Sequence, residues 1–432
     1  RRAAAVSTLR LSELLRGIAD VPSALDVAVT RLVADSRRVL AGDVFVALAG
    51  ASTHGLRHAD EVLAKGAAAI LHEARSHDAT QSAEITLSTN AAGRAIAVPN
   101  LRARLGELAD RASGSPSSAL RVIGVTGTNG KTSTVQLIAQ ALEKLGTPAG
   151  TIGTLGAGRV GRIVEGERTT PDVLSVHALL ARLRDDGARA VAMEVSSHAL
   201  DQGRVDGVRF EVAVFSNLTR DHLDYHGTMA AYGEAKAKLF AWSTLRGAVI
   251  NVDDDFGRAL AARAGHGADA NPAWTVSAAG DATARLRAEN LALTGDGLRF
   301  DLVEDVGFTH AQHRECIASP LLGRFNADNL LAVAGALRAL GFDFESVAAV
   351  LPTLEPVHGR MTRLGGHGKR LVVVDYAHTD DALRKALATL RETVRPGGRL
   401  IAVFGCGGDR DRGKRALMGR AAGELCELVV VT

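Results

Sequence analysis

The segment from residue 120 to residue 145 constrains the fold of this chain more than any other. An apolar run, Leu120–Val125, leads into the glycine-rich stretch Gly124-Val-Thr-Gly-Thr-Asn-Gly-Lys-Thr132, and a helical pattern then extends to Leu145. A strand, a glycine turn and a helix in this order direct backbone N–H groups and the positive end of the helix at one point, where a phosphate group can bind. The segment therefore predicts an α/β fold with a nucleotide site at the carboxyl end of a strand.

Within this turn, Lys131 is placed to reach the terminal phosphates, and Thr132 carries the hydroxyl group that ligates magnesium in many phosphate loops. The other residues expected around the nucleotide phosphates are Gly127, Thr128, Asn129, Gly130 and Ser133. The general pattern has glycine at position 125, where this chain has valine, so an ordinary glycine-rich turn is the alternative. The strand before the turn and the helix after it favour the phosphate loop.

The first two of three predicted α/β units cover most of the chain. Residues 1–115 alternate short β-rich runs with helical stretches, the last of them from about Leu101 to Ala112. A Gly/Ser/Pro-rich segment at 113–118, which is typical of a linker, marks the boundary of this unit. Residues 116–355 alternate apolar strands with helical patterns. The later strands of this unit are expected at 190–193, 212–215 and 247–251. Such alternation predicts a parallel sheet covered by helices on both faces.

The third unit, residues 356–432, follows a break near Leu354–Gly359 and starts a new α/β pattern. Its expected elements are strands at 370–374, 400–404 and 428–432 and a helix from Asp380. A doubly wound domain needs more strands and helices than these, so we expect the native chain to continue beyond Thr432 and this domain to be incomplete here.

Composition limits the partners of the protein. The 51 Lys+Arg against 48 Asp+Glu give a net charge of only +3, so no basic field suggests nucleic-acid binding. No apolar run is long enough for a membrane span, which predicts no membrane insertion. The three cysteines have no paired spacing, as is typical of reduced thiols in the cytoplasm. We expect a soluble, cytoplasmic and monomeric protein with small anionic ligands.

Four longer motifs follow the phosphate loop, and together they identify a family. They are Met193-Glu-Val-Ser-Ser-His-Ala-Leu200, Asn217-Leu-Thr-Arg-Asp-His-Leu-Asp-Tyr-His226, Asp375-Tyr-Ala-His378 and Gly405-Cys-Gly-Gly-Asp-Arg-Asp-Arg-Gly-Lys414. In this order, from about Asp35 to Thr432, the chain resembles the UDP-N-acetylmuramoyl-dipeptide ligases (MurE) of the Mur ligase family. The resemblance implies a UDP-binding domain, a central P-loop ATPase domain and a Rossmann-like domain for an amino acid.

The resemblance also implies how magnesium would be held. In the family, residues matching Glu194 and His222 serve magnesium ions, and the lysine matching Lys236 is carbamylated, which turns a cation into a carboxylate. Only eight of the 51 basic residues are lysines, and arginine cannot form this adduct. The alternatives are a solvated strand end for Glu194, a helix start for His222 and a surface position for Lys236. The spacing of His222, Asp224 and His226 also suggests zinc, but the family gives no support for it.

Substrate residues follow from the same resemblance. The positions that match muramoyl-peptide contacts are Thr169, Thr170, Ser196, Gln202 and Arg204. Those that match the uridine-nucleotide region are Ser36, Ala51, Ser52 and Thr53. If the resemblance is set aside, each set of residues is interpreted as an ordinary polar loop.

The resemblance places the remaining candidates around ATP and the incoming amino acid. Asn326 and Asn329 match an adenine-side pair, and Arg360 and Asp375 match residues that meet ATP when the third domain closes. Buried structural asparagines and a hinge ion pair are the alternatives. Arg410 matches an arginine that touches the incoming diamino acid.

The implied activity is the ATP-dependent addition of meso-diaminopimelate to UDP-N-acetylmuramoyl-L-alanyl-D-glutamate through an acyl phosphate. The Gly-Gly-Asp-Arg form that ends at Arg410 resembles enzymes that add diaminopimelate more than those that add lysine. The alternatives are a lysine-adding ligase, a folylpolyglutamate synthetase-like ligase, and a P-loop protein that binds nucleotide without ligase activity.

Overall fold

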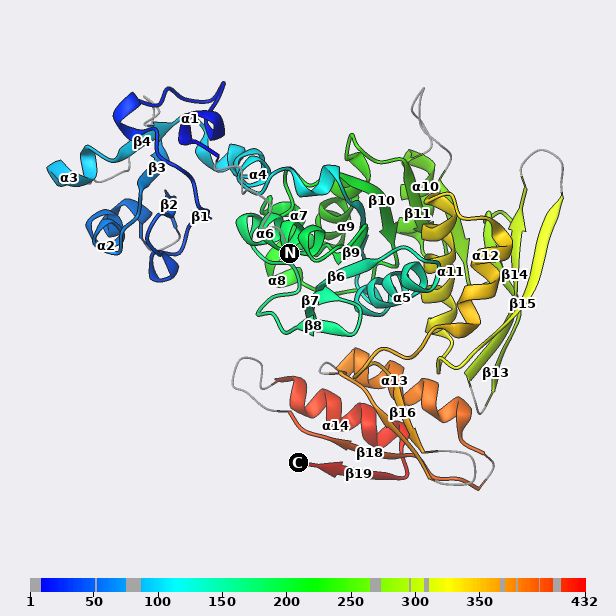
Figure 1. The fold of residues 1–432 in the computed structure, drawn as a ribbon. Coiled ribbons are helices and arrows are strands. Elements are labelled where there is room, and N and C mark those ends of the chain that lie inside the picture. Colours follow the sequence, from blue (N-terminus) through cyan, green and yellow to red (C-terminus); the bar gives the residue numbers. More distant parts are fainter. Residues whose placement is uncertain are drawn as a thin grey trace.

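The computed structural model describes three units that follow one another along the chain (Figure 1). The described residues are 9–50, 53–74, 87–264, 273–294, 297–306, 311–365, 370–377, 380–395, 397–406 and 413–432. Short 3₁₀ turns connect many of the elements, at Ser23–Leu25, Ser36–Arg38, Gly55–His58, Pro116–Ser118, Lys238–Ala241 and Leu351–Thr353.

The N-terminal unit is a parallel sheet in the order β1-β2-β3-β4. Its strands are β1 (Leu32–Val33), β2 (Val44–Ala47), β3 (Ala69–Glu73) and β4 (Ala95–Val98), and its helices are α1 (Leu11–Leu14), α2 (Ala59–Ala64), α3 (Thr89–Ala92) and α4 (Leu101–Ala112). The helix α4 ends where the predicted linker begins. It packs against α6 of the central unit, and Val173 of α6 belongs to the same apolar cluster as the N-terminal core.

The central unit is built on one sheet of eleven strands in the order β15-β14-β13-β12-β11-β10-β5-β9-β6-β7-β8. The strands are β5 (Arg121–Thr126), β6 (Ala149–Gly153), β7 (Gly156–Arg159), β8 (Arg162–Val164), β9 (Ala190–Glu194), β10 (Phe210–Phe215), β11 (Gly247–Asn251), β12 (Trp274–Ser277), β13 (Leu286–Thr294), β14 (Gly297–Asp305) and β15 (Gln312–Ser319). The parallel sheet predicted from the sequence is confirmed for β6, β9, β5, β10, β11 and β12.

That prediction is wrong at both edges of the sheet, where β7 and β8 on one side and β14 and β15 on the other run antiparallel to their neighbours. The connections explain the difference. Antiparallel strands can be joined by a two-residue turn, whereas parallel strands need a crossover of a dozen or more residues. Only residues 160 and 161 separate β7 from β8, and Gly161 has the positive φ of 77° that such a turn favours.

Helices cover both faces of the central sheet, as the sequence predicts. They are α5 (Lys131–Lys144), α6 (Val173–Asp185), α7 (Ser197–Asp201), α8 (Leu223–His226), α9 (Met229–Ala237), α10 (Asp255–Ala264), α11 (Phe325–Ala339) and α12 (Phe344–Val350). Alternate residues of β5 point to opposite faces. Ile123 packs in the core that contains α5 and α11, and Val122 packs in the core that contains α6.

The described residues of the C-terminal unit form two pairs of strands and two helices, drawn in orange and red in Figure 1. The strands β16 (Thr362–Gly365) and β17 (Leu371–Val374) are antiparallel, and β18 (Ile401–Phe404) and β19 (Leu428–Val431) are parallel. The helices α13 (Asp380–Thr393) and α14 (Gly413–Leu425) pack their apolar side chains, including Leu383 and Met418, against Leu400 and Ala402.

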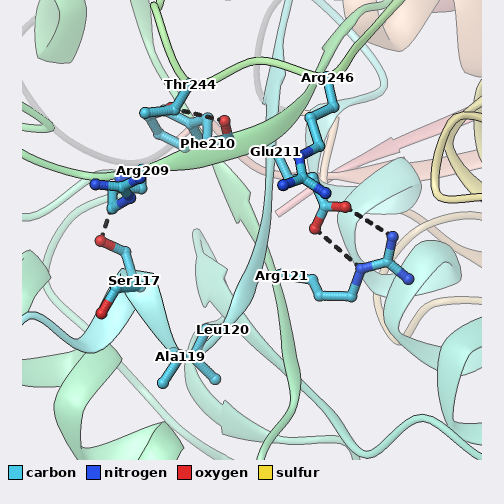
Figure 2. A pocket seen from close by; sticks show the side chains of 10 residues that line it. Ser117, Ala119, Leu120, Arg121, Arg209, Phe210, Glu211, Thr244 and Arg246 are labelled. Carbon is cyan, nitrogen blue, oxygen red and sulfur yellow. Dashed lines mark hydrogen bonds and ion pairs between the residues drawn. The ribbon is translucent and has the colours of Figure 1, made fainter.

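The amino ends of β5 and β10 are joined by an ion pair. Arg121 donates through Nε and Nη2 to the two carboxylate oxygens of Glu211, at 2.9 and 2.7 Å (Figure 2). It also donates to the carbonyl oxygen of Leu340 after α11. Arg121 and Glu211 form part of the wall of a cavity of about 430 Å³. None of the helices in the described ranges has both the length and the apolar composition that a membrane crossing requires.

Candidate nucleotide and substrate site

The glycine-rich turn forms a loop between the carboxyl end of β5 and the first residue of α5, Lys131. Gly127 has φ 140°, and a Cβ atom there would lie 2.0 Å from Ser216 Oγ. Gly130 has φ 84°, and a Cβ atom there would lie 2.6 Å from Asn329 Oδ1. Glycine has no Cβ atom and adopts positive φ values without strain, so both positions require glycine.

The motif that begins at Asn217 lies directly against this loop. The backbone N–H of Thr128 donates to the carbonyl of Asn217 at 2.8 Å, and that of Asn129 donates to Asn217 Oδ1 at 3.0 Å. The Ser216 hydroxyl donates to the carbonyl of Asn129 at 2.6 Å. The residues after β10 therefore fix the shape of the loop.

Lys131 folds back onto its own loop. Its Nζ donates to the carbonyl oxygens of Gly127 at 3.0 Å and Thr128 at 2.9 Å. Burial lowers the pKa of Lys131 below its usual value, although the carboxylates of Glu194 and Asp221 act in the opposite direction. The ammonium group is thus held among neutral carbonyl groups at the start of α5.

Glu194 ends β9 next to β5 and is 1% exposed. Its Oε1 accepts from the backbone N–H of Thr154 at 2.8 Å, and its Oε2 accepts from the Thr154 hydroxyl at 3.2 Å. The alternative that Glu194 is a solvated strand end is therefore wrong. Thr154 was not recognised from the sequence, because it lies outside every motif and 40 positions before its partner Glu194.

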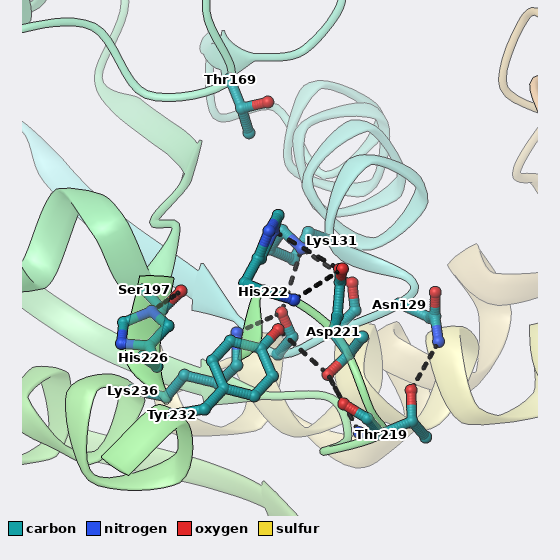
Figure 3. A network of polar contacts seen from close by, with 12 residues as sticks. Asn129, Lys131, Thr169, Ser197, Thr219, Asp221, His222, His226, Tyr232 and Lys236 are labelled. Atoms are coloured by element: carbon teal, nitrogen blue, oxygen red, sulfur yellow. Dashed lines mark hydrogen bonds and ion pairs between the residues drawn. The ribbon is translucent and has the colours of Figure 1, made fainter. Parts of the chain in front are cut away.

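Lys236 lies on α9 and is also 1% exposed, so the alternative of a surface lysine is wrong. Its Nζ donates to the carbonyl of Gly127 at 2.7 Å and lies 4.2 Å from the centre of the Tyr232 ring (Figure 3). Burial, helped by the nearby Lys131, lowers the pKa of Lys236 well below its usual value. Lys238 points elsewhere and pairs with Asp201 at 2.8 Å.

His222 precedes α8 with a positive φ of 51°, and its side chain is 45% exposed. Its Nε2 lies 3.4 Å from Asp221 Oδ2, and its ring packs edge-on against His198, with 4.8 Å between ring centres. Within the described parts of the chain, no three His, Cys, Asp or Glu side chains are arranged to hold a metal on their own. Burial keeps the pKa values of Lys131 and Lys236 below their usual level, and the carboxylate of Asp221, which sequence reasoning missed, acts in the opposite direction on both.

The five residues predicted to contact the muramoyl peptide come together beside Glu194. Thr170 donates through Oγ1 to the carbonyl of Glu194 at 2.8 Å, and the Ser196 N–H donates to Thr170 Oγ1 at 3.2 Å. Arg204 donates to the carbonyl of Thr170 at 3.0 Å and to Gln202 Oε1 at 2.6 Å. The Thr169 hydroxyl lies 3.0 Å from that of Thr154, which binds Glu194.

The asparagine pair lies at the start of α11, beside the loop. Asn329 Nδ2 donates to Asn326 Oδ1 at 2.8 Å, and Asn326 Nδ2 donates to the carbonyl of Leu322 at 2.7 Å. The Thr134 hydroxyl of α5 donates to Asn329 Oδ1 at 3.2 Å. Both amides are buried. These contacts are those expected of buried structural asparagines, and they also leave the pair next to the loop, where adenine-side residues are expected.

Arg360 connects the C-terminal unit to the phosphate loop. Its Nη2 lies 3.4 Å from Thr132 Oγ1, and its guanidinium group stacks over Tyr376 at 4.9 Å from the ring centre. Asp375 accepts from the backbone N–H of Met361 and Ala377, both at 2.9 Å. Asp375 therefore orders the backbone next to Arg360.

The candidates of the N-terminal unit make contacts within that unit. The carbonyl of Ser36 accepts from Lys65 Nζ at 3.0 Å, and that of Thr53 accepts from the N–H of Gly50 at 2.9 Å. Among the contacts of the described residues, none joins Ser36 or Thr53 to the loop. Ala51, Ser52 and Arg410 lie outside the described residues.

Comparison with known families accounts for three stretches of the chain. Residues 28–113 match the Mur ligase family, catalytic domain; residues 125–337 match the Mur ligase middle domain; and residues 359–432 match the Mur ligase, glutamate ligase domain.

The chain is also similar to individual proteins of this family over most of its length. The chain is 57% identical over 425 residues to a UDP-N-acetylmuramoyl-L-alanyl-D-glutamate–2,6-diaminopimelate ligase of Xanthomonas campestris pv. campestris (strain 8004), covering 98% of this chain and 81% of that protein. A solved structure of a ligase of the same name has a TM-score of 0.76 at 36% identity and covers 98% of this chain and 82% of its own. MurF ligase from Thermotoga maritima in complex with ADP shares the fold, with a TM-score of 0.60 at 20% identity over 95% of this chain and 85% of that one. From its loop, its motifs and these similarities, the chain belongs to the Mur ligase family.

Proposed function

We propose that this protein is an ATP-dependent ligase that joins meso-diaminopimelate to UDP-N-acetylmuramoyl-L-alanyl-D-glutamate, a step of peptidoglycan precursor synthesis. The observation that carries the proposal is 57% identity, over 98% of this chain, to a ligase named for that substrate and that amino acid. We assign residues 1–115 to the UDP-linked substrate, 116–355 to ATP and 356–432 to the amino acid. The free cysteines support a cytoplasmic location.

The ATP phosphates would bind at the start of α5. The N–H groups of the first helical turn, Lys131–Ser133, have no carbonyl partner one turn earlier, because the helix begins there. Lys131 would exchange the carbonyls of Gly127 and Thr128 for phosphate oxygens, which compensate its charge better. Arg360, already beside the Thr132 hydroxyl, would add a second positive charge on the phosphates.

The donor groups beside the loop fit magnesium. Glu194 is a buried carboxylate that accepts hydrogen bonds only from Thr154, and no cation among the described residues forms a salt bridge with it. A hard oxygen ligand that is not paired directly with a cation suits Mg²⁺, with Thr132 and His222 as further ligands. When bound, magnesium neutralises charge on the transferred phosphoryl group.

Lys236 fits this site only after modification, because magnesium prefers oxygen ligands and the lysine side chain ends in nitrogen. Its burial and lowered pKa favour the neutral amine, which is the form that adds carbon dioxide to give a carbamate. A carbamate would place a carboxylate-like group next to the loop. We therefore propose carbamylation of Lys236.

The reaction itself would occur in two steps. The γ-carboxylate of the D-glutamyl residue attacks the γ-phosphorus of ATP, which releases ADP and forms an acyl phosphate. The amine of diaminopimelate then attacks the acyl carbon, phosphate leaves, and the amine loses a proton. Thr170 and Arg204 would orient the dipeptide, Asn326 and Asn329 would lie near adenine, and Arg410 would contact the diamino acid.

The test is product formation by the purified chain. With ATP, magnesium, the UDP-linked dipeptide and meso-diaminopimelate, mass spectrometry should detect the UDP-linked tripeptide, and omission of any one component should prevent it. Lysine and a folate acceptor are offered in parallel. Faster ligation of lysine or folate would replace the proposed substrate, and phosphate release without any acceptor would favour a nucleotide hydrolase over a ligase.

A further inference from the structure

Tyr232 and Lys236 lie one helical turn apart on α9, so their side chains project from the same face of the helix. Both side chains are buried, each with 1% exposure. Lys236 Nζ donates to the carbonyl of Gly127 at 2.7 Å, and the Tyr232 hydroxyl lies 3.2 Å from Thr128 Oγ1 (Figure 3). One face of α9 thus holds two successive residues of the phosphate loop.

The hydrogen bonds of Thr128 determine which hydroxyl group is the donor. A threonine hydroxyl has one hydrogen and two acceptor lone pairs. Thr128 Oγ1 donates to the carbonyl of Thr219 at 3.1 Å and accepts from the Thr219 N–H at 3.0 Å. Its hydrogen is therefore used, and the Tyr232 O–H must donate into the remaining lone pair. Tyr232 completes the hydrogen bonding of this loop side chain.

The ring of Tyr232 has a separate contact. Lys236 Nζ lies 4.2 Å from the centre of the ring, so the ring face limits where the end of the lysine side chain can lie. Tyr232 is among the largest fully buried side chains of the described chain, and its loss would leave space beside Lys236.

We propose that Tyr232 is a positioning residue for nucleotide binding: its hydroxyl group fixes Thr128 of the phosphate loop, and its ring fixes the end of Lys236. This inference rests on the proposed function, since it requires that the loop binds ATP. When Lys131 leaves the carbonyls of Gly127 and Thr128 for phosphate, the loop loses two internal hydrogen bonds. The bond from Tyr232 then remains, together with the bonds of Thr128 to Asn217 and Thr219, to hold Thr128 in place.

The main test separates the hydroxyl group from the ring. Tyr232→Phe removes one oxygen atom, and the dissociation constant of a fluorescent ATP analogue, measured without acceptor, should rise by about two- to tenfold. The KM for ATP should rise in parallel while kcat stays near that of the unaltered protein. Tyr232→Leu, which also removes the ring, should lower kcat as well, because Lys236 is no longer supported.

Two further variants test whether the effect passes through the loop. Phe256 of α10 packs against Gly233 of α9, where an added Cβ would lie 2.4 Å from its ring, and the ring contacts described for Phe256 are with Phe215 and Arg263. Phe256→Leu should loosen α9 without changing the dissociation constant. In a Thr128→Val background, Tyr232→Phe should have no additional effect.

The outcomes are distinguishable. An unchanged dissociation constant in Tyr232→Phe, an equal rise in Phe256→Leu, or additive effects with Thr128→Val would each overturn the positioning role and leave the ligase activity standing. Absence of ATP binding by the unaltered protein would instead refute the proposed function, and the positioning role with it.

Discussion

The two ends of strands β5 and β10 hold charged groups in opposite ways. At the amino ends, the guanidinium group of Arg121 meets the carboxylate of Glu211 through two hydrogen bonds, so each charge faces its counter-charge. At the carboxyl ends, Lys236 and Glu194 are buried and Lys131 is partly buried, and the hydrogen bonds that the structure describes for them are with carbonyl, amide and hydroxyl groups. A buried charge that is not paired directly with a counter-charge is costly, which marks the carboxyl ends as the place where charged ligands would belong.

The largest effect should come from the carboxyl ends. Lys131→Ala should lower kcat for ligation by about 10²- to 10³-fold, because it removes the positive charge nearest the transferred phosphoryl group. Binding of the UDP-linked dipeptide, measured by calorimetry, should change little. Lys144→Ala, an exposed position in the last turn of the same helix, is the matched control and should retain full activity. Normal turnover in Lys131→Ala would show that the loop is not catalytic.

Lys236→Ala should follow, with a loss of roughly 10²-fold that small carboxylates such as formate or acetate partly restore, because they can replace the carbamate beside the loop. Lys238→Ala is the control, since Lys238 pairs with Asp201 at the surface. Kinetics with and without added carboxylate provide the measurement. Full activity of Lys236→Ala, or a loss that carboxylates do not change while the variant remains folded, would contradict the carbamate proposal.

The same comparison shows what the sequence could predict. The phosphate loop was predictable because its residues are neighbours in the chain, and the structure has β5 and α5 within one residue of the expected positions. The helix predicted over 101–112 is confirmed at both ends. Local signals of period and glycine content were sufficient for these elements.

Other features were not predictable, because they depend on residues far apart in the chain. Thr128 meets Tyr232 across 104 positions, and Thr154 meets Glu194 across 40. The antiparallel edge strand β15 is mostly exposed, so it lacks the continuous apolar run by which buried strands are recognised. Only tertiary packing brings these groups together.

A fourth group at the carboxyl ends of the sheet strands is Asp328, on α11, next to Asn251 at the end of β11. Burial, with the nearby Asp253, raises the pKa of Asp328 to about 6, although Asn251 Nδ2 donates to its Oδ1 at 3.0 Å. The pKa of Asp328 in the folded state is above the usual 3.8. Between pH 3.8 and about pH 6, the folded protein therefore binds more protons than the unfolded chain. The protonated carboxyl group therefore contributes stability below about pH 4, and this contribution is lost as the pH rises through about 6.

Asp328→Asn keeps the acceptor for Asn251 and cannot ionise. The free energy of unfolding near pH 7.5 should rise by on the order of 2 kcal/mol relative to the unaltered protein, with little difference near pH 4. Urea unfolding at both pH values measures this. Asp255→Asn, at an exposed position, is the control and should show no such pH-dependent gain. An equal effect of Asp328→Asn at both pH values would mean that ionisation is not the cause.

The smallest effect should come from the amino ends, where the charges are already compensated. Arg121 and Glu211 are only half-buried, with side-chain exposures of 36% and 19%, so solvent screens the pair and its loss should cost about 1 kcal/mol. Arg121→Ala should lower the Tm by a few degrees while kcat and the dissociation constant of ATP stay unchanged. Arg209→Ala, on the wall of the same cavity, removes a charge of the same sign without removing this pair. If Arg121→Ala weakened ATP binding as strongly as Tyr232→Phe, the two ends of the strands would be energetically coupled, and the separation of structural charges at one end from ligand-binding charges at the other would not hold.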